Sequence, residues 1–195
     1  TSGSFTFNES TGAWAYTLDD GDGDTQALTE GEIVHDLLTV ASADGTDIET
    51  IDITITGNND AATFAGDDTG DVTESGVVAG TPTATGTLIV SDVDSSNAVD
   101  AQTDVATDFG TFSINAAGEW SYTLDDGNAT VNALNEGVEL HDVITVTTAD
   151  GTTHDIDITI TGANDAATIS GTATGSVAED GTFVASGDLN VSDVD

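Results

Sequence analysis

The chain has no lysine and no arginine among its 195 residues, whereas aspartate and glutamate together number 37. Only His35, His141 and His154 could become cationic, so the formal net charge at pH 7 is −37 with histidine neutral. Salt bridges to lysine or arginine are impossible, and the compact state has to overcome its own charge repulsion. This absence predicts that cations from the solvent neutralise the folded protein.

The missing cationic residues also exclude classes of function. Nucleic-acid binding requires Lys and Arg to displace phosphate counterions, and an anionic membrane surface would repel this chain. No apolar run approaches the ~20 residues of a transmembrane helix. The opening Thr-Ser-Gly-Ser does not have the pattern of a secretory signal peptide. We therefore expect no nucleic-acid partner and no membrane insertion.

Cysteine is absent and proline occurs once, at Pro82. Disulfides and thiolate metal sites are therefore excluded, and isopeptide cross-links fail because they need a lysine. The lone proline argues against a polyproline or mucin-like stalk. Metal ions in loops are the remaining chemistry for cross-linking the chain. Carboxylate oxygens select hard cations, and calcium tolerates irregular loop cages, so the sequence predicts Ca²⁺ as the cofactor.

Apolar residues make up 37% of the chain and fall in alternating runs, which excludes a disordered acidic tail. Ile51, Ile53 and Ile55 share one face of an extended segment, while the residues between them are polar. Residues 139–147 and 154–161 alternate in the same way. Such alternation of β-branched residues is typical of half-buried strands in antiparallel sheets.

The sequence is an imperfect internal repeat with a period near 105 residues. Such a period is too long for a solenoid unit and fits one whole β-sandwich of about 100 residues. The repeated stretches are W-A-Y-T-L-D-D-G at 14–21 and W-S-Y-T-L-D-D-G at 120–127, N-D-A-A-T at 59–63 and 164–168, and V-S-D-V-D at 90–94 and 191–195.

The Asn-Asp-Ala-Ala motif, with a strand expected on each side, is the best candidate for the linker between repeats. It predicts that residues 1–57 are the C-terminal part of one β-sandwich repeat. Residues 58–162 are then a complete repeat of about seven strands with its leading linker, and residues 163–195 the N-terminal part of the next. We expect further copies on both sides. The alternative is that the two end fragments pair with each other as a circularly permuted domain.

Together these motifs resemble the VCBS-type repeat of giant bacterial surface proteins, over essentially the whole chain. The matching elements, in order, are the G-T-F, W-S-Y-T-L-D, Ala-Asp-Gly, I-D-I-T-I-T-G, Asn-Asp-Ala and Ser-Asp-Val-Asp motifs. The resemblance implies an all-β fold of tandem immunoglobulin-like or cadherin-like Greek-key β-sandwiches. It also implies an extracellular or cell-surface RTX-type adhesin, exported by type I secretion. Ala62 and Ala167 stand where the family usually has proline.

The resemblance places calcium at the junctions between domains, and the residues independently indicate such a site. In an extended Asp-x-Asp strand two carboxylates lie on one side, where they repel unless a cation lies between them. The linker Asn-Asp pairs, and a glutamate in the loop before each Asp-x-Asp, could complete the oxygen shell. Which carboxylates share an ion is left open. The predicted metal ligands are Asn59, Asp60, Glu74, Asp92, Asp94, Asn164, Asp165, Glu179, Asp193 and Asp195.

Other acidic and aromatic residues favour structural interpretations. The Asp-Gly pairs at Asp44 and Asp150 are typical turn formers, whereas the doubled aspartate before Gly127 is as consistent with a ligand as with a turn. Trp14 and Trp120, in strand patterns, are predicted to be core anchors rather than sugar-stacking residues.

His35 and His141 precede Asp36 and Asp142 in predicted strands, and a His-Asp pair also occurs in catalytic sites. No serine or cysteine nucleophile motif accompanies them, so we interpret them as strand histidines at a sheet edge and expect no enzyme.

The sequence thus favours a calcium-rigidified structural spacer in a long extracellular adhesin or surface fibre, supporting cell adhesion or biofilm attachment. The expected partners are neighbouring repeats of the same chain. Two alternatives belong to other classes of function. One is homotypic assembly into an extracellular filament or sheath through an unpaired strand. The other is a module that binds carbohydrate or a cell surface.

Overall fold

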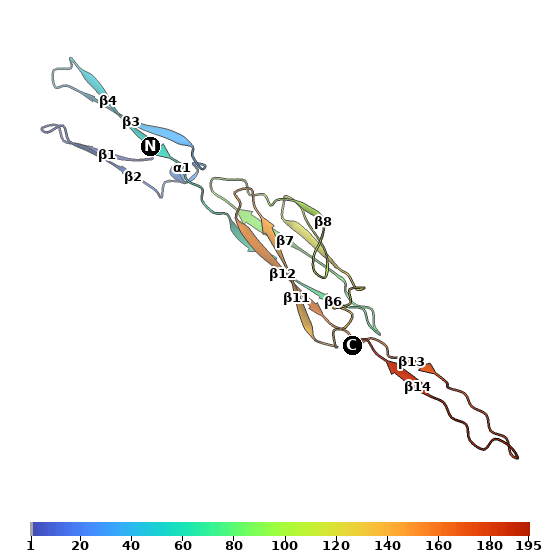
Figure 1. Ribbon diagram of the computed structural model, residues 1–195. Helices are drawn as coiled ribbons and strands as arrows, with labels where there is room; N and C mark the ends of the chain where they lie inside the picture. Colours follow the sequence, from blue (N-terminus) through green and yellow to red (C-terminus); the bar gives the residue numbers. More distant parts are fainter. Residues whose placement is uncertain (1) are drawn as a thin grey trace. The chain divides into compact units, whose positions relative to one another are not determined.

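The computed structural model describes residues 2–195, which form fourteen strands and one four-residue helix (Figure 1). The all-β prediction is confirmed. Within these residues no helix has the length and apolar character needed to cross a bilayer. Contacts divide the chain into two compact units. Unit 1 holds the described residues up to Phe64, together with Val90–Val99 and Thr147–Thr153; unit 2 holds Ala65–Ile89, Asp100–Val146 and His154–Asp195.

The first part of unit 1 consists of two antiparallel hairpins. Strands β1 (Gly3–Phe7) and β2 (Trp14–Leu18) form one, and β3 (Ile33–Ala41) and β4 (Ile48–Thr56) form the other. Helix α1 (Gly23–Gln26) begins after Asp22, whose carboxylate accepts the amide of Asp24 as an N-cap. A hydrogen bond of 2.7 Å from the Tyr16 hydroxyl to Asp36 joins β2 to β3.

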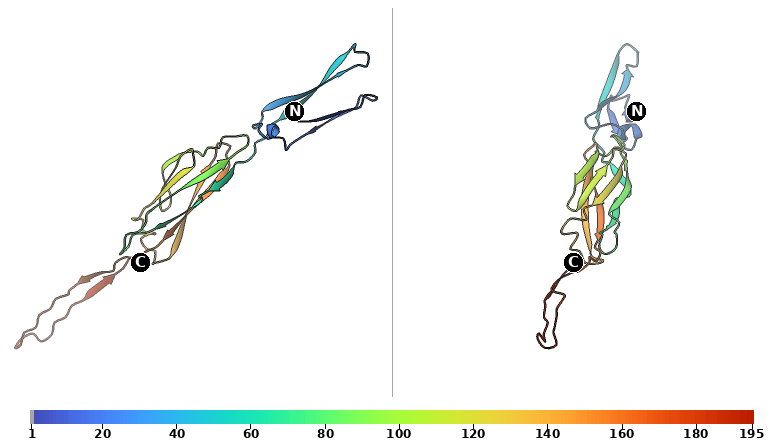
Figure 2. Two further views of the ribbon diagram at one scale, coloured as in Figure 1. Left: turned by 180° about the vertical axis from the view of Figure 1, so that it is seen from behind. Right: turned by 90° about the vertical axis from the view of Figure 1, so that its right-hand side faces the viewer.

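Eight further strands form two sheets of a β-sandwich (Figure 2). One sheet has the order β5-β7-β10-β9-β8 and the other the order β11-β12-β6. The strands are β5 (Thr63–Gly66), β6 (Thr69–Thr73), β7 (Thr83–Ser91), β8 (Gln102–Ala106), β9 (Gly110–Ile114), β10 (Glu119–Leu124), β11 (Glu139–Thr147) and β12 (Thr153–Thr161).

The core of the sandwich follows the predicted alternation. Along β10 the side chains of Trp120, Tyr122 and Leu124 are buried, and the residues between them are exposed. The Ile side chains of β12 at 156, 158 and 160 are fully buried. Period-two patterning therefore placed these side chains correctly, because alternate residues of a strand point to opposite faces.

Strand β6 pairs in parallel with β12, whereas only antiparallel sheets were expected. The reason is the short connection from β5, which consists of Asp67 and Asp68. Asp67 donates its amide to Thr87 in the first sheet, while the carbonyl of Asp68 accepts the amide of Asp157 in the second. The chain therefore changes sheets without reversing its direction.

The last two strands, β13 (Thr168–Gly171) and β14 (Leu189–Ser192), form an antiparallel hairpin in unit 2. All residues of both strands are exposed. Their sequence equivalents are β5 and the last part of β7 in the sandwich. The predicted domain boundaries at 57/58 and 162/163 stay predictions.

Candidate functional site

The first predicted linker lies against the loop that follows β7, within unit 1. The amide of Asp60 donates to Oδ2 of Asp94 at 3.2 Å, and the amide of Asp94 donates to Oδ1 of Asp92 at 3.1 Å. The Asn59 side-chain amide donates to the carbonyl of Asp60 at 2.9 Å, which holds the linker backbone. We call Asn59, Asp60, Asp92 and Asp94 linker site 1.

The second linker repeats this arrangement within unit 2. The amide of Asp165 donates to Oδ2 of Asp195 at 3.2 Å, as Asp60 does to Asp94. The Asn164 side-chain amide donates to the carbonyl of Asp165 at 2.6 Å. Asp193 lies beside Asp195 and is affected by its charge. We call these four residues and Glu74 linker site 2.

Glu74 belongs to the second linker rather than to the Asp-x-Asp motif of its own repeat. Its Oε2 accepts the amide of Ala163 at 3.4 Å, and the carboxylates of Asp165 and Asp195 are near enough to raise its pKa. The hypothesis of a cage assembled within one repeat period is therefore not what the structure shows. Glu74 follows β6 directly, and β6 pairs with β12, whose end leads into the linker.

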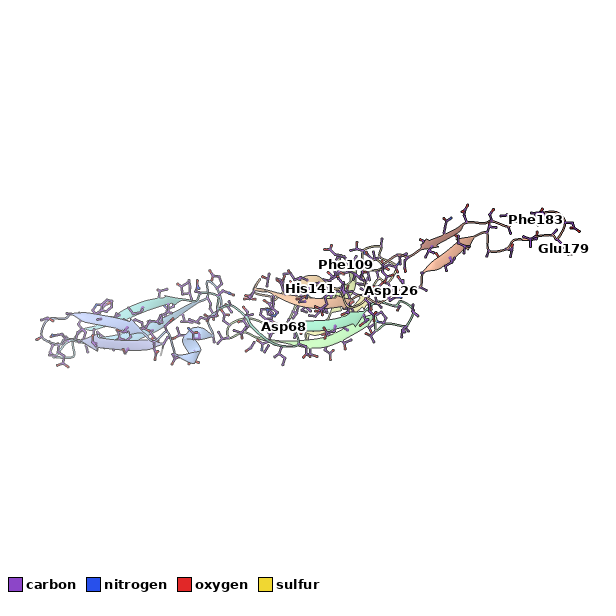
Figure 3. The ribbon with its side chains drawn as sticks, turned by 90° about the horizontal axis from the view of Figure 1, so that it is seen from below. Asp68, Phe109, Asp126, His141, Glu179 and Phe183 are labelled. Carbon is purple, nitrogen blue, oxygen red and sulfur yellow. The ribbon has the colours of Figure 1, made fainter. Side chains whose placement is uncertain are left out.

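Nine of the ten predicted ligands are thus brought together in two groups, and Glu179 is the exception. Its side chain is exposed in the loop of the β13–β14 hairpin, near Phe183, as Figure 3 shows. In residues 2–195 it makes no hydrogen bond, because no counterpart of β12 lies beside this segment to deliver a further linker.

The Asp-x-Asp motifs do not lie in strands, which corrects the expected geometry. β7 ends at Ser91, and the Asp92 carboxylate turns back to accept the amides of Asp94 and Ser95. Aspartate competes for backbone amides in this way and favours turns over strands. Asp94 still directs its carboxylate to the linker, where Oδ2 accepts the amide of Asp60.

Buried carboxylate oxygens without a partner mark both sites. In residues 2–195, five buried side-chain polar atoms lack a hydrogen-bond partner. Four of them are carboxylate oxygens of the two linker sites, namely Oε1 of Glu74, Oδ2 of Asp92, Oδ1 of Asp94 and Oδ2 of Asp165. Buried polar atoms are normally paired, because an unpaired carboxylate loses its hydration without compensation.

The pKa values of the same groups are perturbed. Burial raises the pKa of Glu74, and the neighbouring carboxylates of Asp165 and Asp126 raise it further. Burial also raises the pKa of Asp94, with the adjacent Asp92 carboxylate contributing, and it raises the pKa of Asp193 beside Asp195. A cation bound nearby would offset each of these pKa shifts, because an opposite charge favours the ionised carboxylate.

The donor set fits calcium better than it fits a transition metal. Only carboxylate, amide and backbone oxygens are present at the two linkers, with neither histidine nor cysteine among them. Among residues 2–195, no three or more His, Asp or Glu side chains are placed to hold a metal ion by themselves. A cation at either linker would therefore also need amide and backbone oxygens, which calcium accepts in its shell of six to eight ligands.

Sequence reasoning missed three further acidic residues at the linkers. Glu30 accepts the amide of Asn59 at 2.9 Å, Asp126 accepts the amide of Ser75 at 2.8 Å, and Asp150 accepts the amide of Ala62 at 3.2 Å. Asp126 belongs to the doubled aspartate whose role was undecided, so a signal existed. Asp150 was interpreted as a turn residue and is one, since Gly151 has a φ of 87°.

The His-Asp pairs are surface contacts. Nδ1 of His35 lies 2.6 Å from Asp52, and Nδ1 of His141 lies 2.9 Å from Asp157, with all four side chains about half exposed. Asp36 and Asp142 face the other way and accept tyrosine hydroxyls. β11, which carries His141, is at the edge of its sheet, as predicted.

The sandwich of strands β5 to β12, with acidic linkers before and after it, defines a repeat module of an all-β modular protein. The sequence model of the bacterial cadherin-like domain matches residues 59–162, which is more than half of the chain. The chain therefore belongs to the bacterial cadherin-like domain family, a structural, adhesion-type repeat module rather than a typical enzyme fold. A search of curated proteins found no match.

Proposed function

We propose that this chain is a calcium-rigidified spacer of a long extracellular bacterial adhesin or surface fibre, of the RTX type that carries VCBS repeats. Its role would be to hold a distal binding domain away from the cell during adhesion or biofilm attachment. Membership of the bacterial cadherin-like family supports the modular, adhesion-type part of this proposal. The calcium-dependent part rests on the two linker sites.

The observation that carries the proposal is the set of unpartnered buried carboxylate oxygens at Glu74, Asp92, Asp94 and Asp165. Bound calcium would supply the missing positive charge and connect each linker to the Asp-x-Asp loop beside it. Asn59, Asp60, Asp92 and Asp94 would hold it at the first linker. Glu74, Asn164, Asp165, Asp193 and Asp195 would hold it at the second. The linkers would then lose bending freedom.

The test is a thermal melt followed by circular dichroism in EDTA, in millimolar calcium and in millimolar magnesium. We expect a calcium-specific rise in the melting temperature. Binding to the native state stabilises it by about 2.7 kcal/mol per site when free calcium is about 100 times Kd. No rise, or an equal rise with magnesium, would contradict the metal assignment.

Single substitutions test whether the calcium-induced rise in melting temperature comes from the linker sites. Asp94→Asn and Asp165→Asn should each reduce the calcium-induced shift, because each removes a carboxylate with an unpartnered oxygen. Glu9→Gln is the control that removes the same charge, since Glu9 is exposed in the turn after β1 and belongs to neither linker site. Small-angle scattering should show a shorter and broader distribution of distances in EDTA than in calcium. Equal scattering curves would argue against stiffening even if calcium binds.

The alternative of a carbohydrate-binding module is not favoured by the complete repeat. Its tryptophan, Trp120, is buried and stacks on Phe112 with ring centroids 6.3 Å apart, so it offers no open platform for a sugar.

A further inference from the structure

Three Asn-x-Ser/Thr motifs, the acceptor sequence for N-linked sugars, have no part in the proposed function. They begin at Asn8, Asn128 and Asn190. Because the motif is short and occurs by chance, the conformation of each asparagine decides whether it can react. An acceptor lies in a surface loop and needs a side-chain nitrogen that is free to form a new bond. The three motifs differ in both respects.

Asn8 begins the turn that connects β1 to β2. Its amide donates to the carbonyl of Ala13 at 2.8 Å, and its carbonyl accepts the amide of Gly12 at 2.8 Å. Gly12 has a φ of 70°, a left-handed conformation that glycine adopts readily. All residues from 8 to 13 are exposed. The backbone of this turn is therefore held by hydrogen bonds while its side chains face solvent.

The exposure of this turn is a property of the repeat. In the complete sandwich the equivalent turn lies between β9 and β10 and begins at Asn115. Residues 115–117 are exposed there as well, although β9 and β10 are packed in the core. Packing on the strands of this hairpin therefore leaves the tip of the turn open.

The carboxamide of Asn8 has its oxygen held and its nitrogen free. Oδ1 accepts the hydroxyl of Ser10 at 2.7 Å, the amide of Ser10 at 3.0 Å and the amide of Thr11 at 3.1 Å. This is an Asx turn in which the hydroxyl required by the motif also contacts the asparagine. Nδ2 carries two hydrogens, and within residues 2–195 it donates neither of them to the protein. The acceptor nitrogen is thus available for a new bond.

The other two motifs lack this combination. Asn128 is half-buried, and its Nδ2 donates to the carbonyl of Asp108 at 3.1 Å. Asn190 lies in β14, where it pairs with Ser170 of β13 instead of standing in a loop. Of the three asparagines, only Asn8 therefore joins an exposed turn to an unpaired side-chain nitrogen.

We propose that Asn8 is the site at which the folded chain accepts an N-linked sugar. The donor is a glycosyl diphosphate, either a nucleoside diphosphate sugar or a sugar carried on a lipid diphosphate. A bond forms between Nδ2 and the anomeric carbon of the sugar, and the bond from that carbon to the diphosphate oxygen breaks. The diphosphate leaves with the electron pair, and a base of the transferase takes one proton from Nδ2.

The donors to Oδ1 favour this step. When Nδ2 loses a proton, negative charge develops on the carboxamide oxygen. The Ser10 hydroxyl and the amides of Ser10 and Thr11 already point at that oxygen, so they stabilise the charge without rearrangement. The hydroxyl of the motif therefore has a defined role at Asn8.

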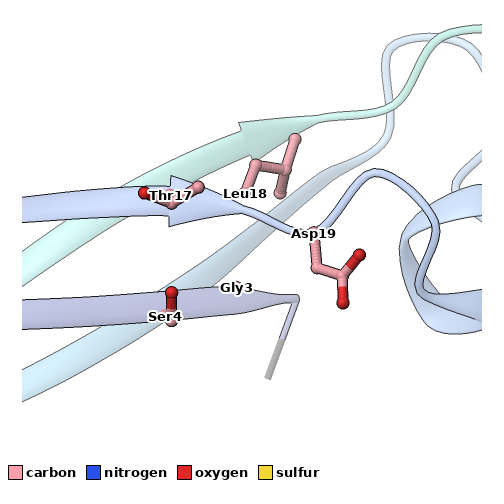
Figure 4. Close-up of a pocket in the computed structure, with 5 residues that line it drawn as sticks. All are labelled: Gly3, Ser4, Thr17, Leu18 and Asp19. Carbon is pink, nitrogen blue, oxygen red and sulfur yellow. The ribbon is translucent and has the colours of Figure 1, made fainter.

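The opposite end of the hairpin offers no second acceptor. There Gly3 pairs with Leu18, whereas Phe7 pairs with Trp14 next to the turn. A pocket at this end is lined by Gly3, Ser4, Thr17, Leu18 and Asp19 (Figure 4). None of these side chains has a carboxamide nitrogen, so N-linked transfer to hairpin β1–β2 is confined to the turn.

Sugar transfer to the full chain, folded in calcium, tests the proposal in two arms. One arm uses a soluble N-glycosyltransferase that reads the three-residue motif, with UDP-glucose. The other uses an oligosaccharyltransferase of the same motif specificity, with a glycan on a lipid diphosphate. Cleavage before aspartate places Asn8, Asn128 and Asn190 in separate peptides for mass spectrometry. We expect sugar at Asn8 in at least one arm, which identifies the donor, and little at the other two asparagines.

Synthetic peptides of the three motifs are the control for the transferases, and all three should be modified because only sequence acts in them. A folded chain that gains no sugar at Asn8 in either arm would overturn the proposal. Modification of Asn128 to the same extent would overturn it too. Asn8 belongs to neither linker site, so the outcome does not depend on the calcium proposal.

Substitutions at Ser10 separate the hydroxyl from the exposed turn. Ser10→Ala keeps Asn8 and should abolish its modification, whereas Ser10→Thr keeps a hydroxyl and should retain it. Asn8→Gln should remove the sugar from this peptide altogether. Transfer to Asn8 that survives Ser10→Ala would contradict the role of the hydroxyl and overturn the proposal.

The equivalent turn of the sandwich supplies a matched control. Asn115 has Ala117 in place of the hydroxyl residue, and its Nδ2 donates to Glu119 at 2.7 Å. Ala117→Ser completes the motif in an exposed turn but leaves the nitrogen paired, so Asn115 should stay unmodified in the folded chain. Modification of Asn115 in this variant at the rate of Asn8 would show that motif and exposure suffice, and would overturn the assignment based on the free nitrogen.

Discussion

A tyrosine–aspartate hydrogen bond connects equivalent strands in both repeats. The Tyr122 hydroxyl donates to Asp142 at 2.8 Å, and the Tyr16 hydroxyl donates to Asp36 at 2.7 Å. Burial, followed by the adjacent carboxylate, raises the pKa of Tyr16 to about 12. Both tyrosines therefore remain protonated donors at physiological pH, and each holds the aspartate beside it through a hydrogen bond.

Tyr122→Phe tests this contact at the residue scale. The buried Asp142 carboxylate would keep Thr107 and the Phe109 amide as donors and lose the third. A hydrogen bond to a charged group contributes about 1.5–3 kcal/mol, so we expect a loss in that range in urea unfolding. Tyr16→Phe, in the more exposed copy, should have a smaller effect. Equal losses would show that burial does not set the strength of this contact.

The linker carboxylates give the metal-free protein an unusual dependence on pH. The pKa of Glu74 is raised above its ordinary 4.5, and the pKa of Asp94 and of Asp193 above 3.8, chiefly by burial. A raised pKa means that the folded state binds the proton more tightly than the unfolded state. Stability is then fully present below the ordinary value and is lost as the pH rises through the folded value.

In EDTA we therefore expect the melting temperature to rise as the pH is lowered towards 4.5, the ordinary pKa of a glutamate such as Glu74. Glu74→Gln should weaken this dependence, because it removes one of the titrating groups. Calcium should reverse the trend, since its ligands must be ionised. Below this window the lowered pKa of Asp150, caused by the hydroxyls of Thr148 and Thr152, acts in the opposite direction. A melting temperature in EDTA that falls steadily from pH 7 would be evidence against these shifts.

At the scale of elements, the same strand sequence has two different environments. β4 and β12 share I-D-I-T-I-T, yet Ile158 is fully buried while its counterpart Ile53 is only half-buried. In residues 2–195, β6 pairs with β12 and no equivalent strand pairs with β4, which leaves Ile53 more exposed. A strand's contribution to stability therefore depends on its neighbours and not on its own pattern.

Ile158→Ala should destabilise the sandwich by about 2–5 kcal/mol, through lost burial and the cavity left behind. Ile53→Ala should cost clearly less in the metal-free monomer, because Ile53 is already partly in contact with water. Urea unfolding followed by fluorescence and circular dichroism measures both variants. If both substitutions lowered the free energy of unfolding by the same amount, Ile53 would be as well covered as Ile158.

For the whole molecule, the charge of −37 is the dominant electrostatic fact. In EDTA we expect NaCl to raise the melting temperature steadily, because screening shortens the range of repulsion to about 10 Å at 0.1 M. Calcium should act at millimolar concentration, where it adds little to the ionic strength. The measurement compares the melting temperatures in calcium and in NaCl at matched ionic strength. If calcium raised the melting temperature no more than NaCl did, its effect would be screening rather than binding.

Much of the molecule was predictable from local pattern. The strands, the central repeat and the burial of Trp120 follow from period-two alternation and the internal repeat, because those signals lie within short stretches of sequence. Linker residues Asn59, Asp60, Asn164 and Asp165 were identified for the same reason. The missing cationic residues and the surplus of carboxylates predict that cations from the solvent neutralise the protein, and this stays a prediction.

The tertiary structure alone decided which distant residues meet. Parallel pairing of β6 with β12 delivers Glu74 to the second linker, and no local pattern reveals that pairing. The bonds of Asp126 to Ser75 and of Asp150 to Ala62 likewise join residues 51 and 88 positions apart. Trp14 and Trp120 have nearly the same local sequence and opposite exposure, because burial is set by the strands packed across from a side chain. The sequence determined which face of each strand is apolar, and packing determined whether other strands bury that face.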